Sequence, residues 1–187
     1  MGEAYYFIIS NNLKIKSTVL KPGEYVLKIQ KRPADYYEDD DIEYLNILSS
    51  KKLIPHVYYI DHEMMILDYK GKSLYDILKN NKRYNLNKIF YNIGKELAKW
   101  KKYDFTHGDL SDGNIVIDDK NNVIFIDPIY VSSISEHGFS NIDLLDLFKY
   151  QRIFTFMFPD DIEYYRNIMK DAFDEEFITN PRKIKRR

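Results

Sequence analysis

Apolar residues recur with the 3.6-residue period of an α-helix over residues 86–100, and no other stretch of the chain shows so long a regular pattern. The apolar positions are Leu86, Ile89, Phe90, Ile93, Leu97 and Trp100. A stripe of this kind covers one face of a helix and is buried against other elements. The pattern therefore predicts a long core helix, with Trp100 as one of its core residues.

Shorter apolar runs, bounded by turn residues, predict strands on both sides of this helix. The runs 115–117 and 123–126 are separated by the polar cluster 118–122, which is typical of a hairpin. Near the N-terminus, three further runs predict three antiparallel strands at residues 4–10, 13–20 and 25–30. In the third of these, the two-residue period of a strand places Val26 and Lys28 on one face, and Tyr25, Leu27 and Ile29 on the other.

The remaining apolar patterns predict four more helices and one more strand. Residues 39–50 carry Ile42, Leu45 and Leu48 on one helical face and begin with three aspartates, which favour a helix N-terminus. A strand at 64–69 leads to Ser73, which is placed to cap a short helix carrying Leu74, Ile77 and Leu78. The last two helices are expected near residues 141–154 and 160–173.

The composition is that of an ordinary globular chain. Its 187 residues are 44% hydrophobic and 16% aromatic, enough for one domain or two small lobes. The 28 basic and 29 acidic residues give no overall charge that would indicate a nucleic acid or a membrane as partner. The absence of cysteine excludes disulfides and thiolate chemistry. With no apolar run approaching a membrane span and no leader pattern at its N-terminus, the chain is expected to be a cytoplasmic enzyme; its oligomeric state is not predicted.

The densest group of chemically capable side chains lies just before and just after the predicted 115–126 hairpin. The loop Thr106–Asn114 carries Asp109 and Asn114, and Asp127 follows the returning strand, thirteen residues after Asn114. A hairpin of this length folds Asp127 back beside the loop, so that three oxygen-bearing side chains converge at its mouth.

Such a convergence suits phosphoryl transfer. Mg²⁺ prefers hard oxygen ligands and usually takes one or two protein ligands, while phosphate oxygens and water complete its octahedron. Asp127 and Asn114 can supply that pair. Asp109 is then left to orient an acceptor hydroxyl and to take its proton. Asp112, Asp118 and Asp119 are expected to be solvated turn residues.

This segment resembles the catalytic loop of the protein-kinase-like superfamily, H-x-D-x-x-x-x-N followed by a metal-binding aspartate. His107, Asp109, Asn114 and Asp127 fall on the matching positions. The resemblance implies an α+β, two-lobed fold with a small antiparallel-sheet lobe at residues 1–70, which binds the nucleotide, and a mainly helical catalytic lobe at residues 71–187. It also implies ATP and Mg²⁺ as cofactors, Asp109 as the base, and His107 as a residue that shapes the loop.

The resemblance extends, less specifically, into the first lobe. Val26-Leu27-Lys28 is similar to the end of the V-A-I-K motif, which implies that Lys28 pairs with the α- and β-phosphates and that Val26 covers the adenine. The helix at 39–50 resembles the one whose glutamate holds this lysine; Glu43 is the best placed residue, and Glu38 is the second choice. The strand at 64–69 resembles the last strand before the hinge. Its backbone near Asp68 and Lys70 would then bond the adenine, and Leu67 would line the pocket.

The sequence departs from the protein-kinase pattern in three places. Between the first two strands there is no G-x-G-x-x-G, and Ser10-Asn11-Asn12 is the candidate phosphate lid. Pro128 and Ile129 replace the Phe-Gly that follows the metal-binding aspartate, and no A-P-E sequence comes after them.

Asp143 resembles the aspartate that braces the catalytic loop from below, although it could equally be a helix-terminal charge.

Two groups of kinases resemble this chain. The compact atypical protein kinases, of the RIO type and of the tRNA-modifying KEOPS complex, have a similar short length and a basic C-terminal end like residues 181–187, a tail that could also engage RNA. The aminoglycoside and fructosamine kinases share His-Gly-Asp-Leu-x-x-Gly-Asn but usually carry a larger substrate-binding subdomain. We therefore expect an ATP- and Mg²⁺-dependent serine/threonine protein kinase of a minimal, atypical kind. The alternatives are a small-molecule kinase with a hydroxyl acceptor and a nucleotide-binding switch or scaffold with little transfer activity.

Overall fold

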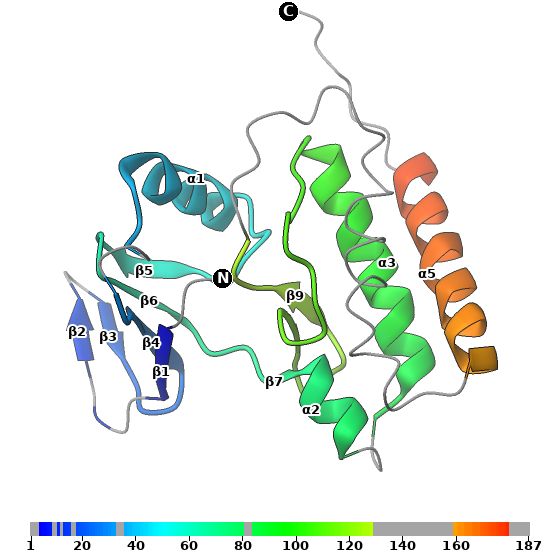
Figure 1. The fold of residues 1–187 in the computed structure, drawn as a ribbon, viewed down its shortest axis with the longest axis horizontal. Coiled ribbons are helices and arrows are strands. Elements are labelled where there is room, and N and C mark those ends of the chain that lie inside the picture. Colours follow the sequence, from blue (N-terminus) through cyan, green and yellow to red (C-terminus); the bar gives the residue numbers. More distant parts are fainter. Residues whose placement is uncertain are drawn as a thin grey trace, which may run out of the picture. The chain divides into compact units, whose positions relative to one another are not determined.

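The structure is a computed structural model that describes residues 4–8, 11, 13–15, 18–32, 36–80, 84–128 and 159–179 (Figure 1). The chain divides into two compact units, residues 1–70 and residues 71–187. The first unit is built mainly of antiparallel strands and the second mainly of helices, so the predicted α+β class is confirmed. The assignment of nucleotide binding to one unit and catalysis to the other stays a prediction.

An antiparallel four-stranded sheet forms the first unit. In spatial order, its strands are β1 (Ala4–Ile8), β4 (Tyr25–Gln30), β6 (Met64–Asp68) and β5 (Val57–Ile60). Directly opposed residues on neighbouring strands carry their side chains on the same face of a sheet. Across β1 and β4 the register opposes Tyr6 to Lys28, and across β4 and β6 it opposes Val26 to Leu67. Tyr6, Val26, Lys28 and Leu67 therefore share one face.

The prediction of a single strand over residues 13–20 is wrong. This segment forms two short strands, β2 (Leu13–Ile15) and β3 (Thr18–Leu20), which pair with each other in a separate two-stranded sheet. A two-residue connection is enough to reverse an antiparallel chain. The reversal buries Leu20 against Tyr25 and Ile66, which a single strand with a two-residue period would not have indicated. As a consequence, β1 pairs directly with β4.

The one helix described in the first unit, α1 (Asp39–Ser50), begins and ends where the sequence predicted. Its N-terminus is closed by a capping box, in which the backbone N–H of Glu38 donates to a carboxylate oxygen of Asp41 at 3.1 Å. Its buried face carries Tyr44, Leu45 and Leu48. Strand β5 was not predicted, and it completes the sheet by pairing with β6.

Three helices and a small sheet are described in the second unit. The helices are α2 (Leu74–Lys79), α3 (Leu86–Lys102) and α5 (Pro159–Thr179), and the strands are β7 (Lys72–Ser73), β8 (Ile115–Ile117) and β9 (Val123–Phe125). The predicted core helix is confirmed as α3, and Trp100 is fully buried on it. The hairpin is confirmed as β8 and β9, and the oxygen of Ser73 caps α2 by accepting from the N–H of Asp76 at 3.1 Å.

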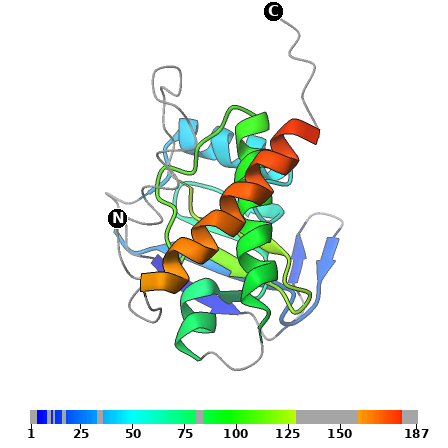
Figure 2. The ribbon, with the colours of Figure 1, turned by 90° about the vertical axis from the view of Figure 1, so that its right-hand side faces the viewer.

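Helix α5 packs along α3, as the two views show (Figures 1 and 2). The approach is closest at Gly94, where a Cβ atom would lie 2.1 Å from the carbonyl oxygen of Met169. Any larger residue at position 94 would push the helices apart. The α5 helix also runs several residues beyond its predicted end at residue 173.

Some predictions fall outside the described residues. These are the helix at 141–154 with Asp143, most of the candidate lid at residues 10–12, and the basic tail at 181–187. Within the part of the chain that the structure does describe, no helix is both long enough and apolar enough to cross a membrane.

Candidate active site

The loop 106–114 is held against an aromatic cluster made of Trp100, His107 and Phe125. The three ring centroids lie between 5.4 and 6.0 Å apart, and His107 meets Phe125 edge-on. Each ring comes from a different element: α3, the loop and β9. All three residues are fully buried, as is Leu110 within the loop itself. Aromatic packing thus ties the loop to the core helix and to the returning strand.

His107 also fixes the loop by hydrogen bonds. Its Nε2–H donates to the carbonyl oxygen of Ile126 at 2.8 Å, and its Nδ1 accepts from the N–H of Asp109 at 3.4 Å. Burial lowers the pKa of His107 to about 4, so its ring is neutral at physiological pH. A neutral ring with both nitrogens engaged is a structural link between loop and hairpin, which confirms the predicted loop-shaping role.

Asn114 and Asp109 are joined directly. The side-chain amide of Asn114 donates to the carbonyl oxygen of Asp109 at 2.8 Å and to its carboxylate at 3.3 Å. These bonds turn the Nδ2 of Asn114 toward Asp109 and its Oδ1 to the opposite side of the amide. Asp109 itself is only 8% exposed, so its carboxylate is held rather than freely solvated.

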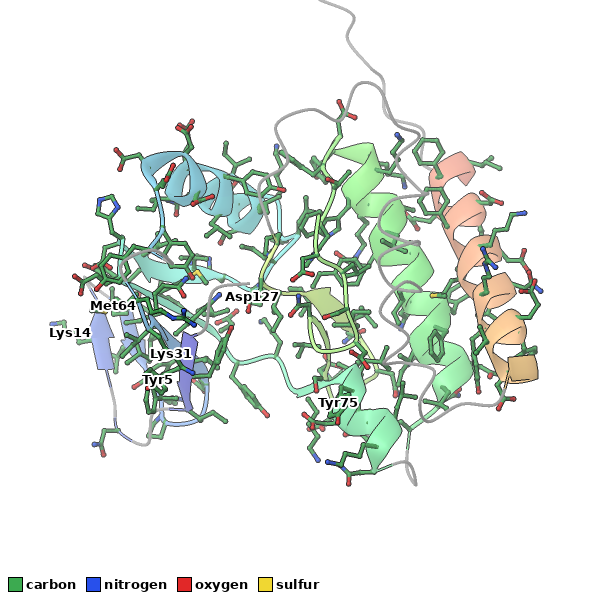
Figure 3. All side chains as sticks on the ribbon, viewed as in Figure 1. Tyr5, Lys14, Lys31, Met64, Tyr75 and Asp127 are labelled. Atoms are coloured by element: carbon green, nitrogen blue, oxygen red, sulfur yellow. The ribbon has the colours of Figure 1, made fainter. Side chains whose placement is uncertain are left out.

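The hairpin brings Asp127 next to this pair. Strands β8 and β9 are in register from Ile115 opposite Phe125 to Ile117 opposite Val123. At the mouth of the hairpin the N–H of Ile126 donates to the carbonyl oxygen of Asn114 at 2.9 Å. Asp127, which is labelled in Figure 3, follows immediately. It is half-buried, and its φ of 56° lies in the left-handed region. That conformation costs an L-residue free energy of about 1 kcal/mol and tends to persist at functional sites.

One aspartate of the loop differs from its prediction. Asp112 was expected to be a solvated turn residue, but it is only 2% exposed. Its carbonyl oxygen accepts from the N–H of Tyr75 at 3.1 Å, which links the loop to the first turn of α2. A charged residue is rarely buried so completely without a role in its surroundings.

Asp118 and Asp119 do lie in the turn of the hairpin. Asp118 accepts from the backbone N–H groups of Lys120 and Asn122, each at 2.8 Å, and from the side-chain amide of Asn122. These bonds outweigh its partial burial and lower the pKa of Asp118. The residue therefore closes the turn that sets the register of β8 and β9, while Asp119 is exposed as predicted.

In the first unit, Lys28 is buried in the sheet with only 8% of its surface exposed. It shares its face with Val26 and Leu67, which are directly opposed in register. Leu67 is buried and Val26 is half-buried, so this face combines apolar side chains with one cationic group. A lysine buried to this extent contributes its methylene stem to the packing of the sheet.

The backbone around Asp68 and Lys70 is partly committed to the fold. The N–H of Asp68 donates to the carbonyl oxygen of His56 at 3.0 Å, so this N–H is not available to an adenine. The carboxylate of Asp68 accepts from the hydroxyl of Tyr58 at 2.6 Å and lies 2.7 Å from the ammonium of Lys70. The hydrogen bond to Asp68, together with burial, raises the pKa of Tyr58 to about 12.

Helix α1 presents the two candidate glutamates differently. Glu43 is exposed, on the side of the helix away from the buried Tyr44 and Leu45. Glu38, the second choice, takes part in the capping box at the start of the helix. The pairing of either residue with Lys28 stays a prediction.

Asn114 and Asp127 suit a magnesium ion by their chemistry, because the Oδ1 of Asn114 and the carboxylate of Asp127 are both hard oxygen donors. Among the described residues there is no group of three or more His, Cys, Asp or Glu side chains that could hold a metal by themselves. A metal held by two protein oxygens completes its octahedron with further oxygens from water or from a ligand.

Residues 39–173 match the family described as "Haspin like kinase domain". The match covers more than half of the chain, and the chain belongs to this family. The predicted protein-kinase-like superfamily is thereby confirmed.

The chain is also similar to a curated protein of Methanosphaera stadtmanae, named "Probable bifunctional tRNA threonylcarbamoyladenosine biosynthesis protein". The two are 27% identical over 130 residues, which cover 66% of this chain and 23% of the relative. The chain thus spans less than a quarter of the length of this relative.

Proposed function

We propose that the protein is an ATP- and Mg²⁺-dependent phosphotransferase in which Asp109 accepts the proton of the attacking hydroxyl. The observation that carries the proposal is the bonding of Asn114 to Asp109. This bonding fixes the two side chains relative to each other. It leaves Asp109 to act as the base and the Oδ1 of Asn114 to bind the metal. Membership of a kinase-like family supports a phosphotransferase, and the geometry of the loop supports these residues as its working parts.

Asp109 is suited to the role of base because its position is fixed at both ends of the loop. Its N–H is bonded to His107, and its carbonyl oxygen and carboxylate are bonded to Asn114. A base that is already oriented can take a proton without first reorganising its surroundings. His107 is a poor alternative, because it is fully buried and both of its ring nitrogens are engaged.

Asn114 and Asp127 are the proposed ligands of the metal. When bound, Mg²⁺ neutralises charge on the transferred phosphoryl group. This chain would hold the ion by the Oδ1 of Asn114 and the carboxylate of Asp127, and the N–H of Ile126 bonded to Asn114 keeps the two ligands in register. The strained backbone of Asp127 supports a functional role for this residue.

The nucleotide is proposed to use the Lys28 face of the first unit. Lys28 would bind the phosphates, and Val26 and Leu67 would contact the base. Because the N–H groups of Asp68 and Tyr69 are already bonded, to His56 and Glu24, adenine would have to use the N–H of Lys70 or the carbonyl groups of this segment. Glu43 remains a candidate partner of Lys28, although its exposure gives it a weaker claim than its sequence position did.

A serine or threonine hydroxyl of a protein is the proposed acceptor. The matched family is a kinase family, and the resemblance of the sequence to the compact atypical protein kinases supports a protein acceptor over a small molecule. The printed name of the curated relative refers to threonylcarbamoyladenosine biosynthesis in tRNA, so proteins that act in tRNA modification form the first class of acceptor to test.

The test is phosphate transfer from γ-labelled ATP in the presence of Mg²⁺. The acceptors offered are the protein itself, fractionated protein extracts with tRNA-modifying fractions among them, and a panel of sugars and aminoglycosides. Asp109→Asn serves as the matched inactive control. Label that appears on serine or threonine, and only with wild-type protein, supports the proposal. Label on a sugar or aminoglycoside would replace the protein acceptor by a small molecule, and ATP binding without transfer to any acceptor would favour a nucleotide-binding switch.

A further inference from the structure

The ammonium group of Lys28 lies over two tyrosine rings of the first unit. Its Nζ is 5.6 Å from the ring centroid of Tyr6 and 5.7 Å from that of Tyr37. Both distances fall within the range of a cation–π contact, and the burial of Lys28 strengthens such a contact. The two rings come from separate parts of the unit: Tyr6 from β1, where it opposes Lys28 in register, and Tyr37 from the segment before α1.

Tyr37 is fixed to the sheet by its backbone. Its N–H donates to the carbonyl oxygen of His62 at 2.9 Å, and its own carbonyl oxygen accepts from the Nδ1–H of His62 at 2.7 Å. His62 lies in the turn between β5 and β6. Glu38, the residue after Tyr37, begins the capping box of α1. Backbone bonds to His62 fix Tyr37 on one side, and the helix cap at Glu38 fixes it on the other. The ring of Tyr37 therefore has a defined position beside the sheet.

An aromatic face holds an ammonium group in a particular way. The attraction arises from the negative charge density of the ring face, so it does not neutralise the cation. Tyrosine rings can therefore fix the position of an ammonium without themselves taking the N–H bonds that phosphate oxygens need.

We propose that Tyr6 and Tyr37 are positioning residues that hold the ammonium of Lys28 for the nucleotide phosphates. The inference rests on the proposed role of Lys28 in ATP binding. It adds two aromatic rings to the positioning of Lys28, for which the family resemblance had implied Glu43.

The same sheet contains a matched control. Lys31 lies 4.7 Å from the ring centroid of Tyr5, and both residues are exposed (Figure 3). Tyr5 precedes Tyr6 on β1, so its side chain points to the opposite face of the sheet. A change at Tyr5 therefore removes a cation–π contact from the same strand without touching Lys28.

The experiment measures the affinities of ATP and of adenosine by calorimetry, in the presence of Mg²⁺. The variants are Tyr37→Leu, Tyr37→Phe, Tyr6→Leu and Tyr5→Leu, each checked for an unchanged unfolding transition. Since Tyr6 is about half exposed, Tyr6→Leu tests the proposal even if Tyr37→Leu is poorly folded. Adenosine carries no phosphate and so reports on any general damage to the binding face.

We expect Tyr37→Leu and Tyr6→Leu each to weaken ATP binding by roughly 3- to 20-fold, the range of one cation–π contact, while adenosine binding changes less than about 2-fold. Tyr37→Phe keeps the ring and should bind ATP like the wild type, and Tyr5→Leu should also be unchanged. In a Lys28→Met background, Tyr37→Leu should have no further effect on ATP.

Equal loss of ATP and adenosine affinity would overturn the proposal, because it would indicate a purely structural role. So would a Tyr37→Phe variant as defective as Tyr37→Leu, or leucine variants that bind ATP normally while Lys28→Met does not. If Lys28→Met itself leaves ATP affinity unchanged, the phosphate-binding role of Lys28 fails, and the positioning role fails with it.

Discussion

Asn114 donates its side-chain amide to Asp109 at two points, the carbonyl oxygen at 2.8 Å and the carboxylate at 3.3 Å. The two residues are five positions apart, one before and one after the turn of the loop. The bonds determine which way each side chain faces, so the proposed base and the proposed metal ligand depend on each other.

The first prediction concerns Asn114. Asn114→Ala removes a metal ligand and the support of Asp109 together. Phosphate transfer should fall by roughly 10²- to 10³-fold, and half-maximal transfer should need a higher Mg²⁺ concentration. The control is Asn122→Ala, which removes a similar amide bond, to Asp118, at the other end of the hairpin. If a magnesium titration gives the same curve for both variants, Asn114 is not a ligand.

The second prediction concerns Lys28. Because its stem is buried, Lys28→Ala would confuse the loss of charge with a packing defect, and Lys28→Met is the cleaner change. Lys28→Met should lower the rate of transfer at least about 100-fold, as expected when a phosphate-binding cation is lost, while the free energy of unfolding changes by less than about 1.5 kcal/mol. Lys31→Met, at the exposed residue that follows β4, should retain full activity. Normal transfer by Lys28→Met would remove this residue from the site.

The third prediction uses the left-handed backbone at Asp127. Asp127→Ala and Asp127→Gly both remove the carboxylate, and both should lose Mg²⁺-dependent transfer. They should differ in stability, because glycine adopts a φ of 56° without strain and alanine does not. Denaturant unfolding should find Asp127→Gly more stable than Asp127→Ala by about 1 kcal/mol. Equal stability would mean that the backbone at this position relaxes when the carboxylate is removed.

The fourth prediction follows from the pKa of His107, which burial lowers from 6.5 to about 4. Above pH 6.5 the ring is neutral in both the folded and the unfolded chain. Between pH 6.5 and 4 the unfolded chain binds a proton that the folded chain does not, so stability falls as the pH falls. This residue alone should cost about 2 kcal/mol between pH 7.5 and pH 5.

The matched variant is His107→Gln, in which that part of the pH dependence should disappear, whatever its absolute stability. The measurement is the free energy of unfolding in denaturant at the two pH values. If the variant loses as much stability between pH 7.5 and 5 as the wild type does, the ring is not the group that titrates.

The sequence predicted the elements whose positions follow from a local pattern of apolar and polar residues. The stripe of α3, the limits of α1 and the β8–β9 hairpin each followed from a pattern that a single element must satisfy. The hairpin of β2 and β3 was missed because it depends on a contact outside the segment. Leu20 is buried against Tyr25 and Ile66, which belong to the four-stranded sheet. Strand β5 was missed although Val57-Tyr58-Tyr59-Ile60 has a strand-like composition.

The candidate site divides in the same way. Asp109 and Asn114 could be predicted because their spacing along one loop is itself the signal, and the hairpin that brings Asp127 back was readable too. The burial of Asp112 and the position of the two rings beside Lys28 could not be predicted. Each depends on contacts between segments far apart in the chain. Tyr37 in particular reaches Lys28 through backbone bonds to His62, for which the sequence carries no motif.

The claim that Asp109 is the base of an active phosphotransferase is tested most directly by a single-turnover assay of Asp109→Asn beside a titration of ATP affinity. Asparagine keeps the shape of the side chain and removes the proton acceptor. The account predicts that ATP affinity stays within a few-fold of the wild type while transfer falls by roughly 10²- to 10⁴-fold. Loss of affinity together with transfer would contradict it, since Asp109 would then be a binding or structural residue, and equal transfer by both proteins would exclude it as the base.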